Sequence, residues 1–261
     1  MISIANLEGM IYTAILVLFR TSSLLLTAPL IGTSMVPARI RLLLCILITI
    51  VMLPSLLVNK LQPDYSLQLI FTIANEVFIG IVLGFAFQMV FQIFIVVGDM
   101  LSMQMGLSFA MMIDPASKIN VPIVSQIYSM MVSLIFFILD GHLFFIQTLG
   151  ESFQILPLTQ AIAIQSFQEI SMMGGWIIVH ALQIALPLCI ALLLVTTSLG
   201  VVARSVPQLN VFTLGMPLSV LLGLVLIWIN IKDIPFHYAN ISREFSAATI
   251  ELLYTGNKYV K

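Results

Sequence analysis

The chain has 261 residues, of which 61% are hydrophobic and only 8% are charged. A soluble domain carries about a quarter charged residues, so this composition excludes an ordinary soluble protein and favours an all-α membrane protein. The formal net charge of −1 gives no reason to expect nucleic-acid binding.

Six apolar stretches are long enough to form membrane helices, since about 20 apolar residues cross a bilayer. In chain order they cover residues 10–31, 42–58, 69–97, 123–147, 176–203 and 211–231. Prolines lie within these stretches or at their ends, at Pro29, Pro54, Pro187 and Pro217. Proline removes a helical hydrogen bond, so the sequence predicts kinked or broken helices that are buried against protein.

The third stretch carries small and polar residues at every fourth position. A carboxylate at the bilayer centre costs about 2.5–3.5 kcal/mol, and small residues let another backbone approach closely, so this stripe predicts a helix contact. The contact is either a seam within the chain or a seam against other subunits or a wet lumen, and we assign it to a subunit interface. The stripe consists of Glu76, Gly80, Gly84, Gln88 and Gln92.

The segment MQMGLSFAMMIDP, residues 103–115, is unusually soft for its surroundings. Residues 98–122 hold five of the fifteen methionines, which conform to irregular and changing surfaces. Gly98 and Gly106 permit bends, and Pro115 and Pro122 bracket a polar turn. Non-helical backbone at membrane depth survives only where it is buried or lines a cavity. The segment is therefore either an ordinary packed helix and loop or a deformable seal across a pore.

The remaining polar residues within apolar stretches suit hydrogen-bonded structural groups better than a catalytic set. The sequence contains neither HExxH nor GxSxG, and the two cysteines lack metal-ligand spacing. We expect no enzyme activity, no cofactor and no metal. An ion-coupled transporter with Glu76, Asp140 or His180 as proton sites is an alternative. The other residues of this kind are Arg20, His142, Cys45 and Cys189.

The distribution of Lys and Arg between the loops predicts the orientation. The first, third and fifth loops hold Arg39, Arg41, Lys118 and Arg204, whereas the second and fourth hold only Lys60. We expect the first three to face the cytoplasm, although the basic C-terminal tail argues the other way. The fifth loop then presents Arg204, Pro207 and Gln208 to the cytoplasm. No basic region precedes the first apolar stretch, so we expect no cleaved signal peptide.

Four motifs resemble the FliR family, which includes the SctT proteins of injectisomes. They are TAPLIGTSMVPARIRLLL at 27–44, GDMLSMQMGLSFAMMIDPASKINVP at 98–122, DGHLFFI at 140–146 and RSVPQLNVFTLGMPL at 204–218. The resemblance covers most of the chain and implies a subunit of the flagellar type III protein export gate in the bacterial inner membrane, at the flagellar basal body. An injectisome counterpart is the alternative from the same family.

The resemblance also implies an architecture and partners. Kinked helical hairpins would form a FliP-like part over residues 1–175 and a FliQ-like hairpin with a C-terminal tail over residues 176–261. One copy of the chain would assemble with FliP and FliQ around a closed channel for unfolded flagellar proteins. FlhB and FlhA would be further partners.

The resemblance assigns the channel plug to the methionine-rich region, from about residue 106 to residue 120. The plug residues would be Gly106, Leu107, Ser108, Phe109, Ala110, Met111, Met112, Asp114 and Pro115.

Overall fold

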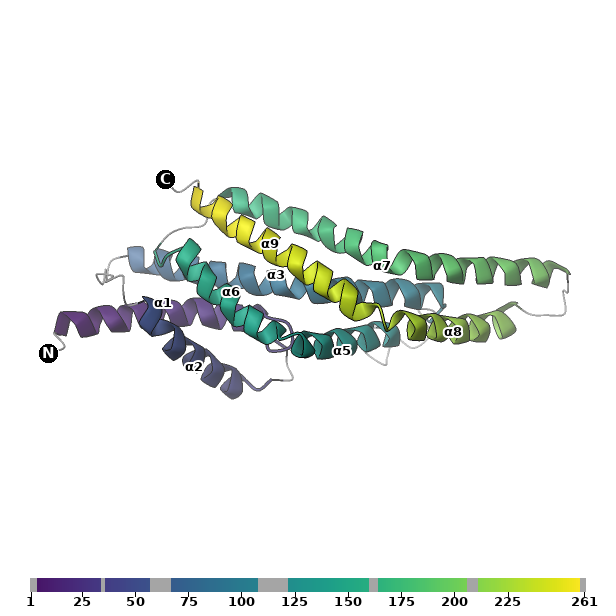
Figure 1. The fold of residues 1–261 in the computed structure, drawn as a ribbon, viewed down its shortest axis with the longest axis horizontal. Coiled ribbons are helices and arrows are strands. Elements are labelled where there is room, and N and C mark those ends of the chain that lie inside the picture. The colour runs from purple at the N-terminus through teal and green to yellow at the C-terminus, as the bar shows by residue number, and fades with distance from the viewer. Residues whose placement is uncertain are drawn as a thin grey trace. The chain divides into compact units, whose positions relative to one another are not determined.

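A computed structural model describes residues 4–33, 36–56, 67–107, 122–159, 164–205 and 211–258. All regular structure within these ranges is helical, which confirms the all-α prediction (Figure 1). The helices are α1 (Ile4–Thr27), α2 (Ala38–Leu56), α3 (Gln68–Gln104), α5 (Ile123–Ile138), α6 (Gly141–Ile155), α7 (Ile164–Ser205), α8 (Val211–Asn230) and α9 (Ile234–Lys258).

The apolar character of these helices fits a membrane protein. Four of the described helices are long and apolar enough to cross a membrane, and the number rises to six if each bent pair forms one span. The bent pairs are α5 with α6, and α8 with α9. The fourth apolar stretch, residues 123–147, was expected to form one helix but contains α5 and the first part of α6.

The helix breaks do not fall where prolines predicted them. Pro54, Pro187 and Pro217 all lie inside helices, so none of the three ends a helix, and a kink at these positions stays a prediction. In membrane proteins neighbouring groups can satisfy the carbonyl that a proline frees, so a helix can continue. The break between α5 and α6 occurs instead at Asp140, whose φ of 54° is left-handed.

The C-terminal tail is the helix α9, which a search for uninterrupted apolar runs misses. Its buried residues recur every three to four positions, as on one face of an amphipathic helix. This periodicity was present in the sequence as the signal for a helix. The buried residues are Ile234, Tyr238, Ile241, Phe245 and Thr249.

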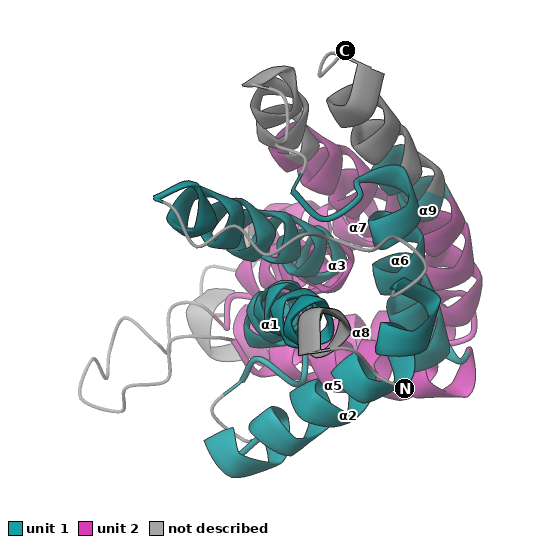
Figure 2. Ribbon diagram, turned by 90° about the vertical axis from the view of Figure 1, so that its left-hand side faces the viewer, with its two compact units in different colours: residues 1–89, 140–173, 244–261 teal, residues 90–139, 174–243 magenta. Residues whose placement is uncertain are grey.

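The chain divides into two compact units, each drawn from segments far apart in the sequence (Figure 2). Unit 1 holds residues 1–89, 140–173 and 244–261, and unit 2 holds residues 90–139 and 174–243. The core of unit 1 includes an aromatic cluster in which the ring of Phe87 lies 5.7, 4.9 and 5.5 Å from those of Phe144, Phe145 and Phe245.

In unit 2, α3 and α5 are in close contact. A Cβ atom at Gly98 would overlap the backbone of Ser125, so the two helices meet at a glycine. The Ser125 hydroxyl donates a hydrogen bond to Asp99 Oδ1 at 2.5 Å. The rings of Phe91 and Phe136 pack 5.5 Å apart on the same pair of helices.

Two of the helices are long for a bilayer. The apolar span of α3 contains 37 residues and that of α7 contains 29, from Gly174 to Val202. At 1.5 Å per residue these are about 55 and 43 Å. Both lengths exceed the hydrocarbon thickness of about 30 Å.

Candidate functional site

The stripe of small residues on α3 faces α1 of the same chain. A Cβ atom at Gly80 would overlap Ser23 Oγ and the carbonyl oxygen of Arg20. A Cβ atom at Gly84 would overlap Thr27 Oγ1. Only glycine lets the two backbones approach this closely, so the seam between α1 and α3 depends on both positions.

A buried ion pair lies at one end of this seam. Arg20 Nε on α1 donates to Glu76 Oε2 on α3 at 2.6 Å, and both side chains are fully buried. Arg20 Nη1 also donates to the Ser152 and Leu156 carbonyls, each at 3.1 Å, and Nη2 donates to the Leu156 carbonyl at 3.1 Å. The guanidinium carbon stands 4.3 Å from the centre of the Phe153 ring.

These bonds join three helices of unit 1. The last carbonyls of a helix lack partners within it, and Arg20 supplies donors to the Leu156 carbonyl just beyond α6. The Ser152 carbonyl accepts both from Arg20 and from the Leu156 N–H. Glu76 Oε1 accepts a bond from the Thr159 backbone N–H at 3.4 Å, just beyond that end. The arrangement can hold α1, α3 and the end of α6 together. Because Glu76 is fully buried and paired with Arg20, the geometry fits a structural role rather than a proton site.

The stripe thus has two parts. Glu76, Gly80 and Gly84 face α1, which is the same-chain seam that the sequence left open as an alternative to the subunit interface. Gln88 is exposed and Gln92 is partly exposed, so the subunit interface stays a prediction for these two amides.

The base of the proposed plug is a well-formed helix end in unit 2. Gly106 adopts a φ of 79° just after α3. Its N–H donates to the Met103 carbonyl at 3.1 Å, and the N–H of Leu107 donates to the Ser102 carbonyl at 3.0 Å. This is the Schellman arrangement, which requires a left-handed residue and therefore favours glycine.

Met105 holds this helix end against α8. Its side chain is almost fully buried, and a Cβ atom at Gly223 would lie only 2.6 Å from its Cγ and Sδ atoms. Gly106 lies next to Met216, which also belongs to α8. The contact had no sequence signal, because Gly223 is one small residue in an apolar run.

Several predicted site residues lie outside the described part of the chain. In the plug only Gly106 and Leu107 are described, and in the fifth loop only Arg204, which is exposed in the last turn of α7. The residues outside are Ser108, Phe109, Ala110, Met111, Met112, Asp114 and Pro115 of the plug, with Pro207 and Gln208 of the loop.

The structure does not gather the remaining polar residues into a reactive centre. Asp140 and His142 are exposed, and the His180 ring packs on Trp176 at 4.4 Å. Cys45 is buried, with Sγ 3.7 Å from the Leu18 carbonyl oxygen. Within the described residues no group of three His, Cys, Asp or Glu side chains could hold a metal ion.

Comparison with known proteins identifies the family. A family model for "Bacterial export proteins, family 1" matches residues 11–245. The chain is 36% identical to the flagellar biosynthetic protein FliR of Escherichia coli strain K12, over 80% of each chain. It is 28% identical to FliR of Aquifex aeolicus strain VF5, over 91% of this chain and 92% of the relative. It is also 28% identical to FliR of Bacillus subtilis strain 168, over 82% and 83% of the two chains.

These matches extend over nearly all the described helices, and each of these relatives is flagellar rather than part of an injectisome. Together with the apolar helices they confirm the resemblance seen in the four motifs. The chain belongs to the FliR family of bacterial export proteins, the membrane-embedded subunits of the flagellar type III export gate.

Proposed function

We propose that the chain assembles, as a single copy with FliP and FliQ, into the closed inner-membrane channel through which unfolded flagellar proteins leave the cytoplasm. The observation that carries this proposal is the family match, which runs from residue 11 to residue 245. The chain would act in transport and not as an enzyme.

The exposed apolar surface supports assembly with other membrane proteins. On α2 alone, Leu42, Leu43, Leu47, Ile50 and Val51 are 60–66% exposed. On α7, Leu193, Leu194, Val201 and Val202 are 50–69% exposed. Surfaces of this kind need lipid or protein to cover them.

The proposal divides the chain into a FliP-like part, residues 1–175, and a FliQ-like part, residues 176–261. The cytoplasmic loop around Arg204, Pro207 and Gln208 would approach FlhB, and FlhA would join the same apparatus. The compact units cross this boundary, because unit 2 combines residues 90–139 with residues 174–243. A FliQ-like part would therefore pack closely on segments from the first part.

Residues 106–120 would form the plug of the closed channel. The support in the structure is the firm attachment at its start, where Gly106 caps α3 and Met105 packs on α8. Leu107, Phe109, Met111 and Met112 would supply the apolar seal, which can hold back ions by dewetting.

Affinity purification tests the assembly. A tagged chain, extracted from its own bacterial membrane in mild detergent, should bring down FliP and FliQ in a complex containing one copy of the tagged chain. The control is an untagged chain in the same cells. A stable homo-oligomer without FliP or FliQ, active in solute uptake in liposomes, would contradict the proposal and favour a transporter.

Deletion of residues 108–117 tests the plug. The deletion leaves α3, its cap and α8 in place, so the complex should still assemble. Cells that make all three subunits should then leak a small, normally impermeant solute. A complex that assembles with the deletion and keeps the membrane tight would show that these residues are not the seal.

A further inference from the structure

The connection between α1 and α2, in unit 1, contains a strained turn centred on Leu30. Leu30 has a φ of 67°, a left-handed value that few residues other than glycine, asparagine and aspartate adopt. The N–H of Ile31 donates to the Pro29 carbonyl at 2.8 Å and closes a three-residue turn around it. A three-residue turn with a positive φ at its centre is the rare and strained form of the γ-turn. Such strain persists only where the surrounding structure imposes it.

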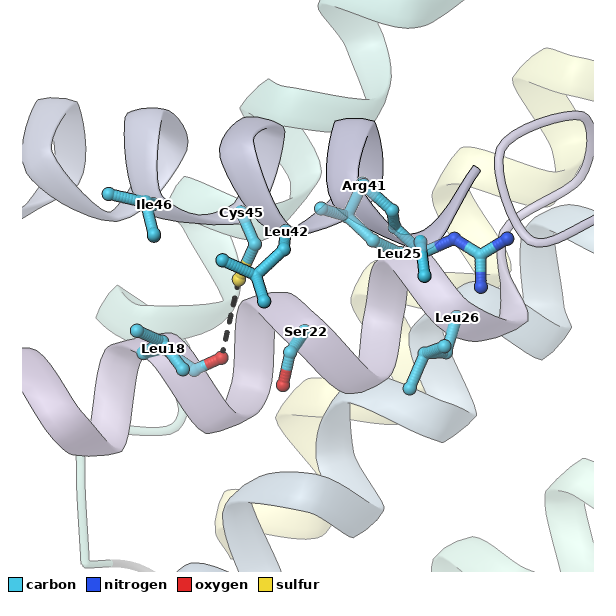
Figure 3. Close-up of a pocket in the computed structure, with 9 residues that line it drawn as sticks. Leu18, Ser22, Leu25, Leu26, Arg41, Leu42, Cys45 and Ile46 are labelled. Atoms are coloured by element: carbon cyan, nitrogen blue, oxygen red, sulfur yellow. Dashed lines mark hydrogen bonds between the residues drawn. The ribbon is translucent and has the colours of Figure 1, made fainter. Parts of the chain in front are cut away.

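The side chain of Arg41, in the first turn of α2, makes the bonds that hold this turn. Its Nε donates to the Ile31 carbonyl at 3.1 Å, directly after the strained residue. Its Nη2 donates to the carbonyls of Thr33 at 2.9 Å and Val36 at 3.3 Å. Figure 3 shows the guanidinium directed toward the connection. One side chain therefore ties the start of α2 to three carbonyls of the connection.

The position of α2 depends on these bonds, because the helix has little other packing. Of its 19 residues only Cys45, Ile48 and Thr49 are buried. Arg41 is itself only partly buried, and Thr33 is exposed. Water can therefore compete for the bonds of Arg41, unlike those of the fully buried Arg20.

We propose that Arg41 is a latch that holds α2 in one of two positions. While Arg41 is bonded to the connection, Leu30 stays left-handed and α2 lies against α1. When these bonds break, Leu30 relaxes to an unstrained conformation and α2 pivots away from α1 about the connection. The pivot changes which apolar surface unit 1 presents, because Leu43, Leu47 and Ile50 on α2 are 61–66% exposed. This proposal does not depend on the assembly with FliP and FliQ.

The thiol of Cys45 reports the pivot. Cys45 is buried against α1, with Sγ 3.7 Å from the Leu18 carbonyl oxygen (Figure 3). It should react only when α2 moves away from α1. Membranes that contain the chain are treated with N-ethylmaleimide, which crosses the bilayer, and the rate of Cys45 modification is followed by mass spectrometry. Cys189, on α7 in unit 2, is the internal reference in the same sample.

Changes at Arg41 test the latch. Arg41→Gln should speed the modification of Cys45 about tenfold, because the charged donor to three carbonyls is lost. Arg39→Gln, which removes an exposed cation from the same helix turn, should leave the rate unchanged. The rate at Cys189 should be the same in both variants.

Changes at Leu30 test the strain. Leu30→Gly should slow the modification of Cys45 about fivefold, because glycine adopts a positive φ freely and no strain then favours release. Leu30→Ala is the matched control, since it also removes the leucine side chain beyond Cβ but keeps the strained backbone. It should not slow the reaction.

The proposal is overturned by equal Cys45 rates in Arg41→Gln and Arg39→Gln, or by equal rates in Leu30→Gly and Leu30→Ala. Faster modification of both Cys45 and Cys189 in Arg41→Gln also counts against it, because that pattern indicates general unfolding. If Arg41→Gln does not accumulate in the membrane, the two Leu30 variants, which keep Arg41, decide alone. None of these results changes whether FliP and FliQ copurify, so failure here is distinct from failure of the proposed function.

Discussion

The side chain of Arg20 makes interactions that water would provide in a soluble protein. It is fully buried, yet its guanidinium pairs with Glu76, donates to carbonyls at the end of α6 and stacks on Phe153. Buried charges are tolerated only when they are paired and hydrogen-bonded, and this one meets both conditions.

Removing one partner of this pair should be far worse than removing both. Arg20→Met leaves the Glu76 carboxylate buried without its cation, and Glu76→Leu leaves the guanidinium unpaired. Each single change should destabilise the chain by about 3–5 kcal/mol. The double variant should recover much of this loss, because no unpaired charge remains. Thermal unfolding of the purified assembly, followed by size-exclusion chromatography, measures the effect.

The double variant is the informative comparison. If both single variants unfold at the temperature of the unchanged protein, the ion pair does not stabilise unit 1. If the double variant is less stable than Glu76→Leu alone, the bonds from Arg20 to α6 outweigh the relief of the unpaired charge.

The sequence identified the residues of this pair but not the pairing. Arg20 and Glu76 both stand out as charges within apolar runs. They are 56 residues apart, and a single sequence does not reveal which apolar helices pack together. For the same reason the partner of Gly80 and Gly84, which is α1, became known only from the structure.

Among the elements, the seam between α1 and α3 depends most directly on residue size. Gly80 lies against the Arg20 carbonyl, which is backbone and cannot rotate away as a flexible side chain would. A larger residue must therefore separate the two helices, and the separation also strains the neighbouring ion pair.

Gly80→Ala should already destabilise unit 1, and Gly80→Leu should prevent accumulation of the folded chain. Alanine normally stabilises a helix relative to glycine by about 1 kcal/mol, so a lowered unfolding temperature would reveal the steric overlap. The control is Gly200→Ala on α7, where no atom lies within 4 Å of the added methyl group. It should be neutral or stabilising. Equal stability gains in both alanine variants would refute a close seam at Gly80.

The existence of the long helices was predictable from apolar runs, but their breaks and their extent were not. Pro187 and Pro217 lie inside helices, whereas Asp140 interrupts one in the left-handed conformation. The search for apolar runs did not predict helix α9, because this helix is amphipathic rather than uniformly apolar. The signal for α9 lay in the sequence as a recurrence every three to four residues, and not as an apolar run.

At the scale of the whole molecule, the orientation in the membrane follows from charges in the loops. Arg204 is exposed at the end of α7, and the loop after it is expected in the cytoplasm. Arg39 and Arg41, at the start of α2, are expected at the same, cytoplasmic face of the membrane.

A cysteine at position 208 tests this orientation. Gln208→Cys, made after Cys45→Ala and Cys189→Ala remove the native thiols, should react with a membrane-impermeant maleimide only once the inner membrane is breached. Lys60→Cys, in the second loop, should react in intact spheroplasts. The reverse pattern would place the fifth loop in the periplasm and invert the orientation of the chain.

The lengths of α3 and α7 bear on how the cell must handle this protein. A helix tilted by 40°, about the largest tilt observed, crosses the hydrocarbon layer in roughly 39 Å. The apolar spans of α3 and α7, at about 55 and 43 Å, are longer than that. Copies made in excess of their partners would therefore expose unburied apolar turns, which quality-control proteases of the membrane recognise. We expect the cellular level of this chain to be set by degradation of orphan copies, so that raising its synthesis alone changes its abundance little.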